Sequence, residues 1–240
     1  MKVAVVIVAA GRGRRLGAEI PKQYIPLGAA CSLRRVAEIF LSINAVRWIV
    51  PVIHPDDRQL CSAALDGLQD SRLLPAVDGA ETRAKSVRCG LERLAPSDPE
   101  YVLIHDAARP FLPTTVISDV IAALRHNEAA CAALPLVDAL WTSRDGAALA
   151  PVPRDGIWRA QTPQGFSFGK ILNAHRNHGG NATDDVAVAK EAGLEVAFVK
   201  GAEQNYKITT ADDLARATRD ARVLDDVAVR SVPVDDRRKH

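Results

Sequence analysis

The sequence has few cysteines and almost no net charge. Its four cysteines are widely spaced and form no C-x-x-C pair, which argues against a zinc site or a disulfide framework. Reduced thiols are typical of a cytoplasmic protein, and that is the location we expect. Lys plus Arg number 31 against 29 for Asp plus Glu, a net charge of +2. The protein therefore lacks the overall positive potential that would attract the phosphates of a nucleic acid, and no nucleic-acid partner is expected.

Long hydrophobic runs are also missing. No apolar run approaches the roughly 20 residues that span a bilayer, so no membrane partner is expected. The run from residue 3 to residue 10 follows a lysine, as in a secretion signal, but it is rich in β-branched residues and is followed at once by Gly11-Arg12-Gly13-Arg14-Arg15. We interpret this run as a buried strand. Hydrophobic residues make up 48% and charged residues 25%, which excludes a disordered or collagen-like chain.

Short apolar runs alternate with segments of helical periodicity. Strands are expected at residues 3–10, 48–53, 73–77 and 101–105, and helices at residues 33–43, 56–66 and 84–94 and after Pro113. This alternation predicts an α/β protein, a three-layer α/β/α Rossmann-like domain with a mostly parallel sheet. Ligands bind such sheets at the carboxyl ends of the strands. The candidate site therefore lies in the turns after Ala10, Val77 and His105.

The alternation breaks between residues 136 and 164. This stretch contains Trp141, Trp158 and the turn-like Arg144-Asp145-Gly146, and it is too long for an ordinary connection. We expect an extended β-arm over residues 137–160 that serves dimerisation, because one domain cannot easily bury both tryptophans of its own arm. The alternation then resumes to about Leu214. A single domain is expected over residues 1–225, followed by a C-terminal tail over residues 226–240.

A glycine-rich and arginine-rich turn follows the first strand. Its glycines, Gly11, Gly13 and Gly17, have the spacing G-x-G-x-x-x-G, which differs from the dinucleotide-binding fingerprint and from the Walker A loop. Glycines allow backbone N–H groups to approach a phosphate, and arginines add charge-assisted hydrogen bonds. Three arginines and the nearby Lys22 favour a triphosphate ligand. On the residues alone, a tight turn with solvated arginines remains open.

Several short motifs resemble one known family. Ala9-Ala10-Gly11-Arg12-Gly13-Arg14-Arg15-Leu16, followed by Pro21-Lys22-Gln23-Tyr24, is similar to the pattern of the 2-C-methyl-D-erythritol 4-phosphate cytidylyltransferases, which belong to the sugar-nucleotidyltransferase superfamily. Further matches follow in order: Asp78-Gly79 with Arg83-Ala84 and Ser86-Val87, His105-Asp106-Ala107-Ala108-Arg109-Pro110, Thr162-Pro163-Gln164, Thr183-Asp184-Asp185 and Asn205-Tyr206-Lys207-Ile208-Thr209. One such match arises easily by chance, but an ordered series along nearly the whole chain does not. The resemblance thus refines the expected fold to a nucleotidyltransferase domain.

The resemblance implies an activity and assigns the site residues. It implies transfer of CMP from CTP to 2-C-methyl-D-erythritol 4-phosphate, with release of pyrophosphate, in isoprenoid precursor biosynthesis. The implied catalytic residues are Arg15 and Lys22, which stabilise the transition state, and Arg154 and Lys207, which hold the sugar phosphate for attack. Thr162 and Thr183 are implied to join the last two at that phosphate. The implied nucleotide-binding residues are Ala9, Ala10, Gly11, Gly13, Gly79, Ala80, Glu81, Ser86, Asp106, Ala107 and Arg109.

The resemblance also implies a cofactor and partners. Mg²⁺ or another divalent cation is expected to be held largely by CTP, with Asp106 placed to help position it, because such hard cations prefer oxygen ligands. The expected partners are CTP, a polyol phosphate and a second copy of the chain, whose arm reaches the neighbour's site. His105 is expected to be structural, since its side chain points opposite to that of Asp106 on a strand.

Three positions depart from the family pattern, and several other functions stay open. The family commonly has Gly at Ala80, Asp at Glu81 and, in many members, Thr at Ala139. A cytidylyltransferase for ribitol 5-phosphate or a related polyol phosphate is the nearest alternative. The uridylyl- and thymidylyltransferases of sugar 1-phosphates are disfavoured by the motif at residues 105–110, and an NAD-linked oxidoreductase by the glycine spacing. A non-catalytic nucleotide-binding regulatory module would not need the pair that positions the attacking phosphate.

Overall fold

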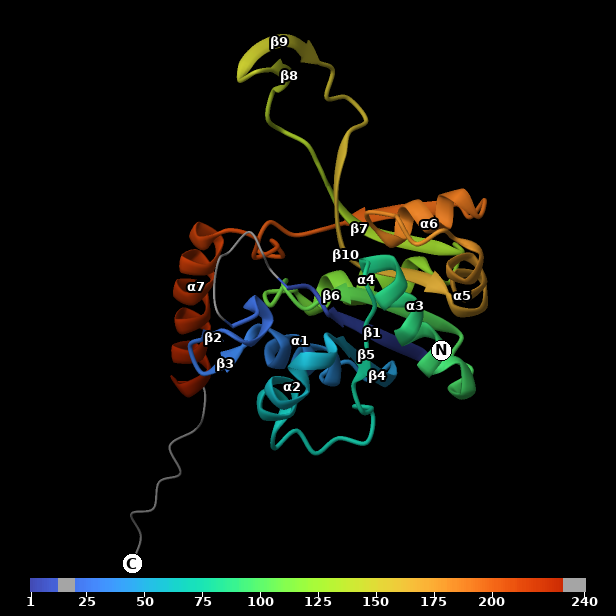
Figure 1. Cartoon of the computed structure of the whole chain (residues 1–240), viewed down its shortest axis with the longest axis vertical. Helices are drawn as coiled ribbons and strands as arrows, with labels where there is room; N and C mark the ends of the chain where they lie inside the picture. Colours follow the sequence, from blue (N-terminus) through green and yellow to red (C-terminus); the bar gives the residue numbers. More distant parts are fainter. Residues whose placement is uncertain (13–19, 231–240) are drawn as a thin grey trace, which may run out of the picture.

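A seven-stranded sheet forms the centre of the protein, as seen in the computed structural model, which describes residues 1–12 and 20–230 (Figure 1). The strand order is β11-β7-β10-β6-β1-β4-β5. All neighbouring pairs are parallel except those of β10, which runs antiparallel to β6 and β7. The first half of the chain supplies β1 (Val3–Ala9), β4 (Val46–Ile53), β5 (Val77–Asp78) and β6 (Tyr101–Asp106). The second half supplies β7 (Ala129–Pro135), β10 (Trp158–Ser167) and β11 (Val196–Lys200).

Helices cover both faces of the sheet, which confirms the predicted α/β/α architecture. One face packs against α1 (Ser32–Leu41), α2 (Arg58–Leu65) and α4 (Thr114–Ala123). The other packs against α3 (Arg83–Leu94), α5 (Phe168–Asn177) and α6 (Asp185–Glu191). Short 3₁₀ turns occur at Lys22–Tyr24, Pro55–Asp57 and Ala95–Ser97.

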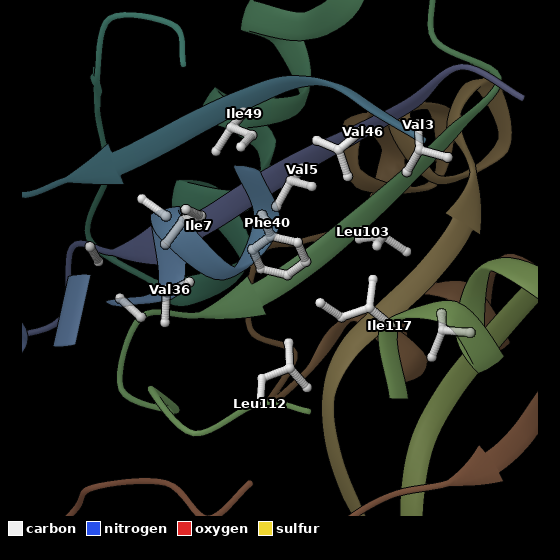
Figure 2. Packing of buried hydrophobic residues seen from close by; sticks show 14 of the residues in the cluster. Val3, Val5, Ile7, Val36, Phe40, Val46, Ile49, Leu103, Leu112 and Ile117 are labelled. Carbon is white, nitrogen blue, oxygen red and sulfur yellow. The ribbon is translucent and has the colours of Figure 1, made fainter. Parts of the chain in front are cut away.

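The buried strand β1 shows why the sequence forms this sheet. Val5 and Ile7 point to one face, where they pack near Phe40 of α1 (Figure 2), while Ala4 and Val6 point to the other. All four are fully buried. A strand that is apolar on both faces is stable only between two helical layers, so the interpretation of residues 3–10 as a buried strand is confirmed.

Two parts of the sheet differ from the prediction. The strand expected at residues 73–77 is reduced to a single bridge between Leu73 and Ile49 and to the two-residue β5. Pro75 lies between these two contacts, and it has no N–H to donate to a neighbouring strand. In addition, no strand was expected at residues 129–135, which form β7 beside β10.

The predicted arm is a two-stranded hairpin that projects from the sheet (Figure 1). It consists of β8 (Leu140–Arg144) and β9 (Ala147–Val152), which pair antiparallel. Asp145 and Gly146 form the turn with positive φ values of 50° and 82°, a conformation that glycine and aspartate tolerate better than most residues. β10 then leads from the arm back into the central sheet.

The C-terminal helix α7 (Ala211–Arg230) covers a small hairpin of β2 (Pro26–Leu27) and β3 (Ala30–Cys31). It continues past residue 225, where the tail was expected to begin. Arg35 holds this helix through two contacts of 2.7 Å to the Asp225 carboxylate. In the described part of the chain, none of the helices has the length and apolar character that a membrane crossing requires.

Candidate active site

A cavity of about 880 Å³ opens at the carboxyl ends of β1, β5 and β6. The three turns selected from the sequence meet there, together with two separate lysines. Of the expected residues, those that line the cavity are Ala9, Ala10, Gly11, Lys22, Gly79, Ala80, Glu81, Ser86, Asp106, Ala107 and Lys207. Gly13 and Arg15 lie outside the described residues.

The backbone turns that form one wall are tightly packed. A Cβ atom added to Gly79 would lie 2.6 Å from Cβ of Ala10 and 2.8 Å from Oγ of Ser86, so only glycine fits between these residues. The Ser86 hydroxyl accepts a hydrogen bond from the Ala80 N–H at 2.9 Å and lies 2.9 Å from the Thr82 carbonyl oxygen, to which it donates. Ser86 is therefore a buried support for the turn at Gly79 and Ala80.

Lys22 joins two loops at the edge of the cavity. Its Nζ donates to the carbonyl oxygen of Ile208 at 2.6 Å, which places it beside the segment that carries Lys207. The neighbouring Gln23 is buried and donates to the carbonyl oxygens of Ala9 at 2.6 Å and of Gly11 at 3.2 Å. The segment at 21–23 thus holds the start of the glycine-rich turn.

Asp106 lies at the centre of a cluster of cations. Its Oδ2 contacts Nζ of Lys207 at 2.7 Å, and its Oδ1 contacts Nε of Arg83 at 3.2 Å. Nε of Arg109 is 3.9 Å from Oδ2. Burial alone would raise the pKa of Asp106, but these three cations outweigh it and hold the pKa well below its usual range. Asp106 is therefore an anion that keeps Lys207 at the cavity wall.

Arg83 is a cavity residue to which the prediction gave no role. Its Nη1 donates to Oδ2 of Asp185 at 2.8 Å while its Nε faces Asp106. Asp185 is completely buried and also contacts Nε2 of His175 at 3.1 Å. The sequence motif at residues 78–87 contained Arg83, but a lone arginine in the first turn of a helix usually faces solvent. Only the fold brings in Asp185, which is 102 positions away.

His105 and Thr162 support Asp106 from behind. Thr162 Oγ1 accepts from the Asp106 N–H at 3.1 Å and lies 3.0 Å from Nδ1 of His105. Nε2 of His105 lies 3.1 Å from the Arg109 carbonyl oxygen. Complete burial lowers the pKa of His105 to about 4, so the ring is neutral near pH 7 and has a structural role, as expected.

Four of the expected residues do not line the cavity. Thr162 is buried with its hydroxyl turned inward, and Thr183 is exposed. Arg109 donates from Nη1 to the Asn205 carbonyl oxygen at 2.8 Å and so braces the loop before Lys207. Arg154 is exposed on the arm, where its Nη1 donates to the Val137 carbonyl oxygen. The structure does not bring Arg154 to the residues that line the cavity.

The cavity contains few groups that can hold a metal ion. No cluster of three or more His, Cys, Asp or Glu side chains occurs among residues 1–12 and 20–230. Asp106 offers one carboxylate, and both of its oxygens already contact cations. These residues fit a metal ion that arrives with its own oxygen ligands, such as those of a triphosphate, better than an ion held by the protein alone.

A mainly parallel sheet that opens onto a cavity lined by Gly11, Lys22 and Lys207 is the arrangement expected of a nucleotidyltransferase. Comparison with known proteins gives the particular family. Residues 3–221 match the family model of 2-C-methyl-D-erythritol 4-phosphate cytidylyltransferase, IspD, and the chain belongs to this family.

Two curated relatives have different lengths. The chain is 49% identical over 219 residues to the bifunctional enzyme IspD/IspF of Rhodospirillum rubrum, with 91% of this chain and 56% of the relative covered. It is 45% identical over 219 residues to the 2-C-methyl-D-erythritol 4-phosphate cytidylyltransferase of Cereibacter sphaeroides strain KD131, with 91% and 96% covered. The chain thus spans about half the length of the bifunctional relatives and nearly all of the shorter one.

Solved structures of the same family share the fold. The 4-diphosphocytidyl-2C-methyl-D-erythritol synthase from Anaerococcus prevotii superposes with a TM-score of 0.78 at 27% identity, covering 92% of this chain and 96% of that chain. The 2-C-methyl-D-erythritol 4-phosphate cytidylyltransferase from Thermus thermophilus gives a TM-score of 0.73 at 31% identity, covering 92% and 100%. The nucleotidyltransferase fold expected from the motifs is confirmed.

Proposed function

We propose that the protein transfers CMP from CTP to 2-C-methyl-D-erythritol 4-phosphate, giving 4-diphosphocytidyl-2-C-methyl-D-erythritol and pyrophosphate for isoprenoid precursor biosynthesis. The observation that carries the proposal is that Lys22, which contacts the residue after Lys207, and Lys207 itself line the same cavity as the turn at Gly79. Family membership and the relatives' names give the substrate class. Free cysteines in the described residues accord with a cytoplasmic location.

In this reaction, a phosphate oxygen of the polyol phosphate attacks the α-phosphorus of CTP. The new bond joins that oxygen to phosphorus, and the bond to the bridging oxygen of the β-phosphate breaks, so pyrophosphate leaves with the electron pair. The nucleophile is already an anion, so the main need is to neutralise charge in the transition state. Lys22 meets this need at the triphosphate, and we assign the same role to Arg15. Lys207 holds the attacking phosphate in line.

The other wall of the cavity binds the nucleoside. Backbone groups of Ala10, Gly79 and Ala80 line the cavity next to the buried Ser86, and they offer donors and acceptors of the kind that cytosine requires. Glu81 is exposed at this wall, at a position where the family commonly has Asp. We propose that the other nucleotide-binding residues implied by the family resemblance contact the ribose and the phosphates of CTP.

We propose that Mg²⁺ enters the site with CTP and is held mainly by the triphosphate oxygens. The ion would neutralise phosphate charge when bound. Asp106 is the one predicted metal contact of the chain, and it would share an oxygen with Lys207 or Arg83.

We further propose a homodimer in which each arm contributes Arg154 to the neighbour's cavity. Trp141 on the arm is 57% exposed. At the base of the arm, Trp158 and Phe198 stack with ring centroids 5.4 Å apart, yet remain 42% and 47% exposed. Exposed large aromatic side chains are enriched at protein interfaces. Analytical ultracentrifugation at micromolar concentration tests this, and a fully active monomer would contradict it.

Release of pyrophosphate tests the activity. The protein is incubated with CTP, Mg²⁺ and, in turn, 2-C-methyl-D-erythritol 4-phosphate, ribitol 5-phosphate and related polyol phosphates. Fast release with the first substrate is expected. Preferential release with ribitol 5-phosphate would change the assigned substrate, and no release with any polyol phosphate would refute the transferase assignment.

A further inference from the structure

Arg83, the first residue of helix α3, connects the cavity to the buried contact between Asp185 and His175. It is the only cation in the described residues that contacts both Asp106 and Asp185, at 3.2 Å and 2.8 Å. Asp185 starts α6, and His175, which contacts it, belongs to α5. The guanidinium group of α3 thus contacts α6 directly and is linked to α5 through Asp185.

Asp185 is held too firmly to follow a moving arginine. It is completely buried, and its backbone N–H and that of Val186 donate to Oε1 of Gln164 at 3.0 and 3.1 Å. Burial alone would raise the pKa of Asp185, but Arg83 and His175 outweigh it and lower the pKa. Since Asp185 stays charged and fixed, the planar guanidinium of Arg83 has one orientation that satisfies both carboxylates.

Asp106 in turn controls Lys207. A lysine side chain is long and has a large rotamer entropy, and only its contact of 2.7 Å to Asp106 fixes the ammonium group in the described contacts. Asp106 divides its charge between Lys207 and the more distant Arg109 on Oδ2 and Arg83 on Oδ1. Without Arg83, Oδ1 would lose its cation, and the carboxylate would attract Lys207 more strongly, away from an incoming phosphate.

We propose that Arg83 is a positioning residue for the transfer reaction, acting through Asp106 on Lys207 and itself oriented by the buried Asp185–His175 pair. This inference rests on the proposed cytidylyl transfer. It assigns no direct contact between Arg83 and substrate. A misplacement of about 1 Å at such a group lowers a rate by up to about 10²-fold, so the effect belongs in kcat rather than in KM.

The test measures kcat and the KM values for CTP and the polyol phosphate in two variants. Arg83→Lys keeps a cation between both carboxylates, so the fold is retained, but its single ammonium cannot hold both carboxylates in the fixed geometry of a guanidinium. Asp185→Asn removes the charge that orients Arg83. Each is expected to lower kcat by roughly 10-fold or more and to change both KM values by less than about 3-fold.

Arg88→Lys is the matched control. Arg88 lies on the same helix α3, but it is exposed, and within the described part of the chain its one ion pair is with Glu92, at 3.7 Å. Its kcat should equal that of the unmodified protein. Asp185→Asn leaves Arg83 beside a neutral partner, which can lower the stability of the fold. Thermal melting of each variant is therefore recorded. If Asp185→Asn does not fold, the result for Arg83→Lys decides whether Arg83 has the positioning role.

The outcomes separate the two proposals. An unmodified protein that is inactive with every polyol phosphate refutes the proposed function itself. With an active unmodified protein, an unchanged kcat in Arg83→Lys overturns the positioning role. A large rise in the KM for CTP with kcat unchanged also overturns it, because Arg83 would then contact the nucleotide directly.

Discussion

At the scale of single residues, the clearest expectation concerns Lys22. A cation that stabilises only the transition state contributes about 10² to 10³ in kcat, so Lys22→Ala should lower kcat by roughly 10²-fold and weaken CTP binding much less. Steady-state kinetics and calorimetric titration with CTP measure the two effects. Lys190→Ala, which removes an exposed lysine paired with Glu195 at 3.1 Å, is the control. Equal losses in kcat and CTP affinity would show that Lys22 serves ground-state binding.

A second expectation at this scale concerns the pH dependence of stability. The folded pKa of His105 is about 4, below its ordinary 6.5, so between these values the unfolded chain binds more protons and stability falls as the pH falls. The loss from about pH 7 to about pH 5 is about 2 kcal/mol for this group. The pKa of Asp106 is also lowered. Asp106 therefore reduces the stability further only in more acidic solution, as the pH falls through the ordinary pKa range of an aspartate and below it. Urea unfolding at both pH values measures the change, and His105→Gln, which cannot gain a proton, should lose less.

At the scale of elements, the hydrophobic pattern predicted those helices and strands whose formation depends on residues close together in the sequence. Helix α3 appears where Ala84, Val87, Leu91 and Leu94 form one apolar stripe, and all four are buried. The length of β5 was overestimated because a hydrophobic pattern does not show that Pro75 has no N–H to donate to a neighbouring strand. The expected arm over residues 137–160 included the start of β10, but the antiparallel place of β10 in the central sheet was not predicted, because its direction depends on where the arm returns to the sheet.

Some residues of the candidate site could be predicted from the sequence, and others are brought together only by the fold. Residues of the cavity that sit at strand ends, such as Ala10 and Asp106, could be predicted because parallel strands end together. The pair of Arg83 and Asp185 could not, since nothing in the sequence links two helices 102 positions apart. The inward turn of Thr162 likewise follows from its contact with the Asp106 N–H, which only the assembled sheet creates.

Helix α7 gives a prediction at the element scale. Asp225 accepts from Arg35 through both carboxylate oxygens at 2.7 Å and from the Ala29 N–H at 2.8 Å. Charge-assisted hydrogen bonds contribute about 1.5–3 kcal/mol each when well formed, and partial exposure reduces this, so Asp225→Asn should lower the free energy of unfolding by about 1–2 kcal/mol.

Asp226→Asn is the control for that measurement. Asp226 is the next residue on the same helix and is exposed, so its replacement should change the free energy of unfolding by less than about 0.5 kcal/mol. Urea unfolding followed by circular dichroism compares the two variants. Equal stability would mean that the apolar contacts of Ala217 and Ala221, both fully buried, hold α7 without help from the ion pair.

At the scale of the whole molecule, the position of Arg154 matters most. It follows the end of β9, in the arm that projects from the sheet (Figure 1), and it does not line the cavity that Lys22 and Lys207 line. If Arg154 acts in the transfer, the simplest way is from a second subunit. A closed two-fold dimer would then contain two sites, each built from the core of one chain and the arm of the other.

Mixing two inactive variants tests this arrangement. In a heterodimer of Lys22→Ala and Arg154→Ala chains, one site combines both substitutions, while the other combines an intact core with an intact arm. Random exchange of subunits makes about half of the dimers mixed, so about a quarter of the normal activity should return. The two chains are mixed after mild unfolding and refolding, and pyrophosphate release is compared with that of each variant treated alone. If Arg154 acts within its own chain, every site in the mixture carries one substitution and no activity returns.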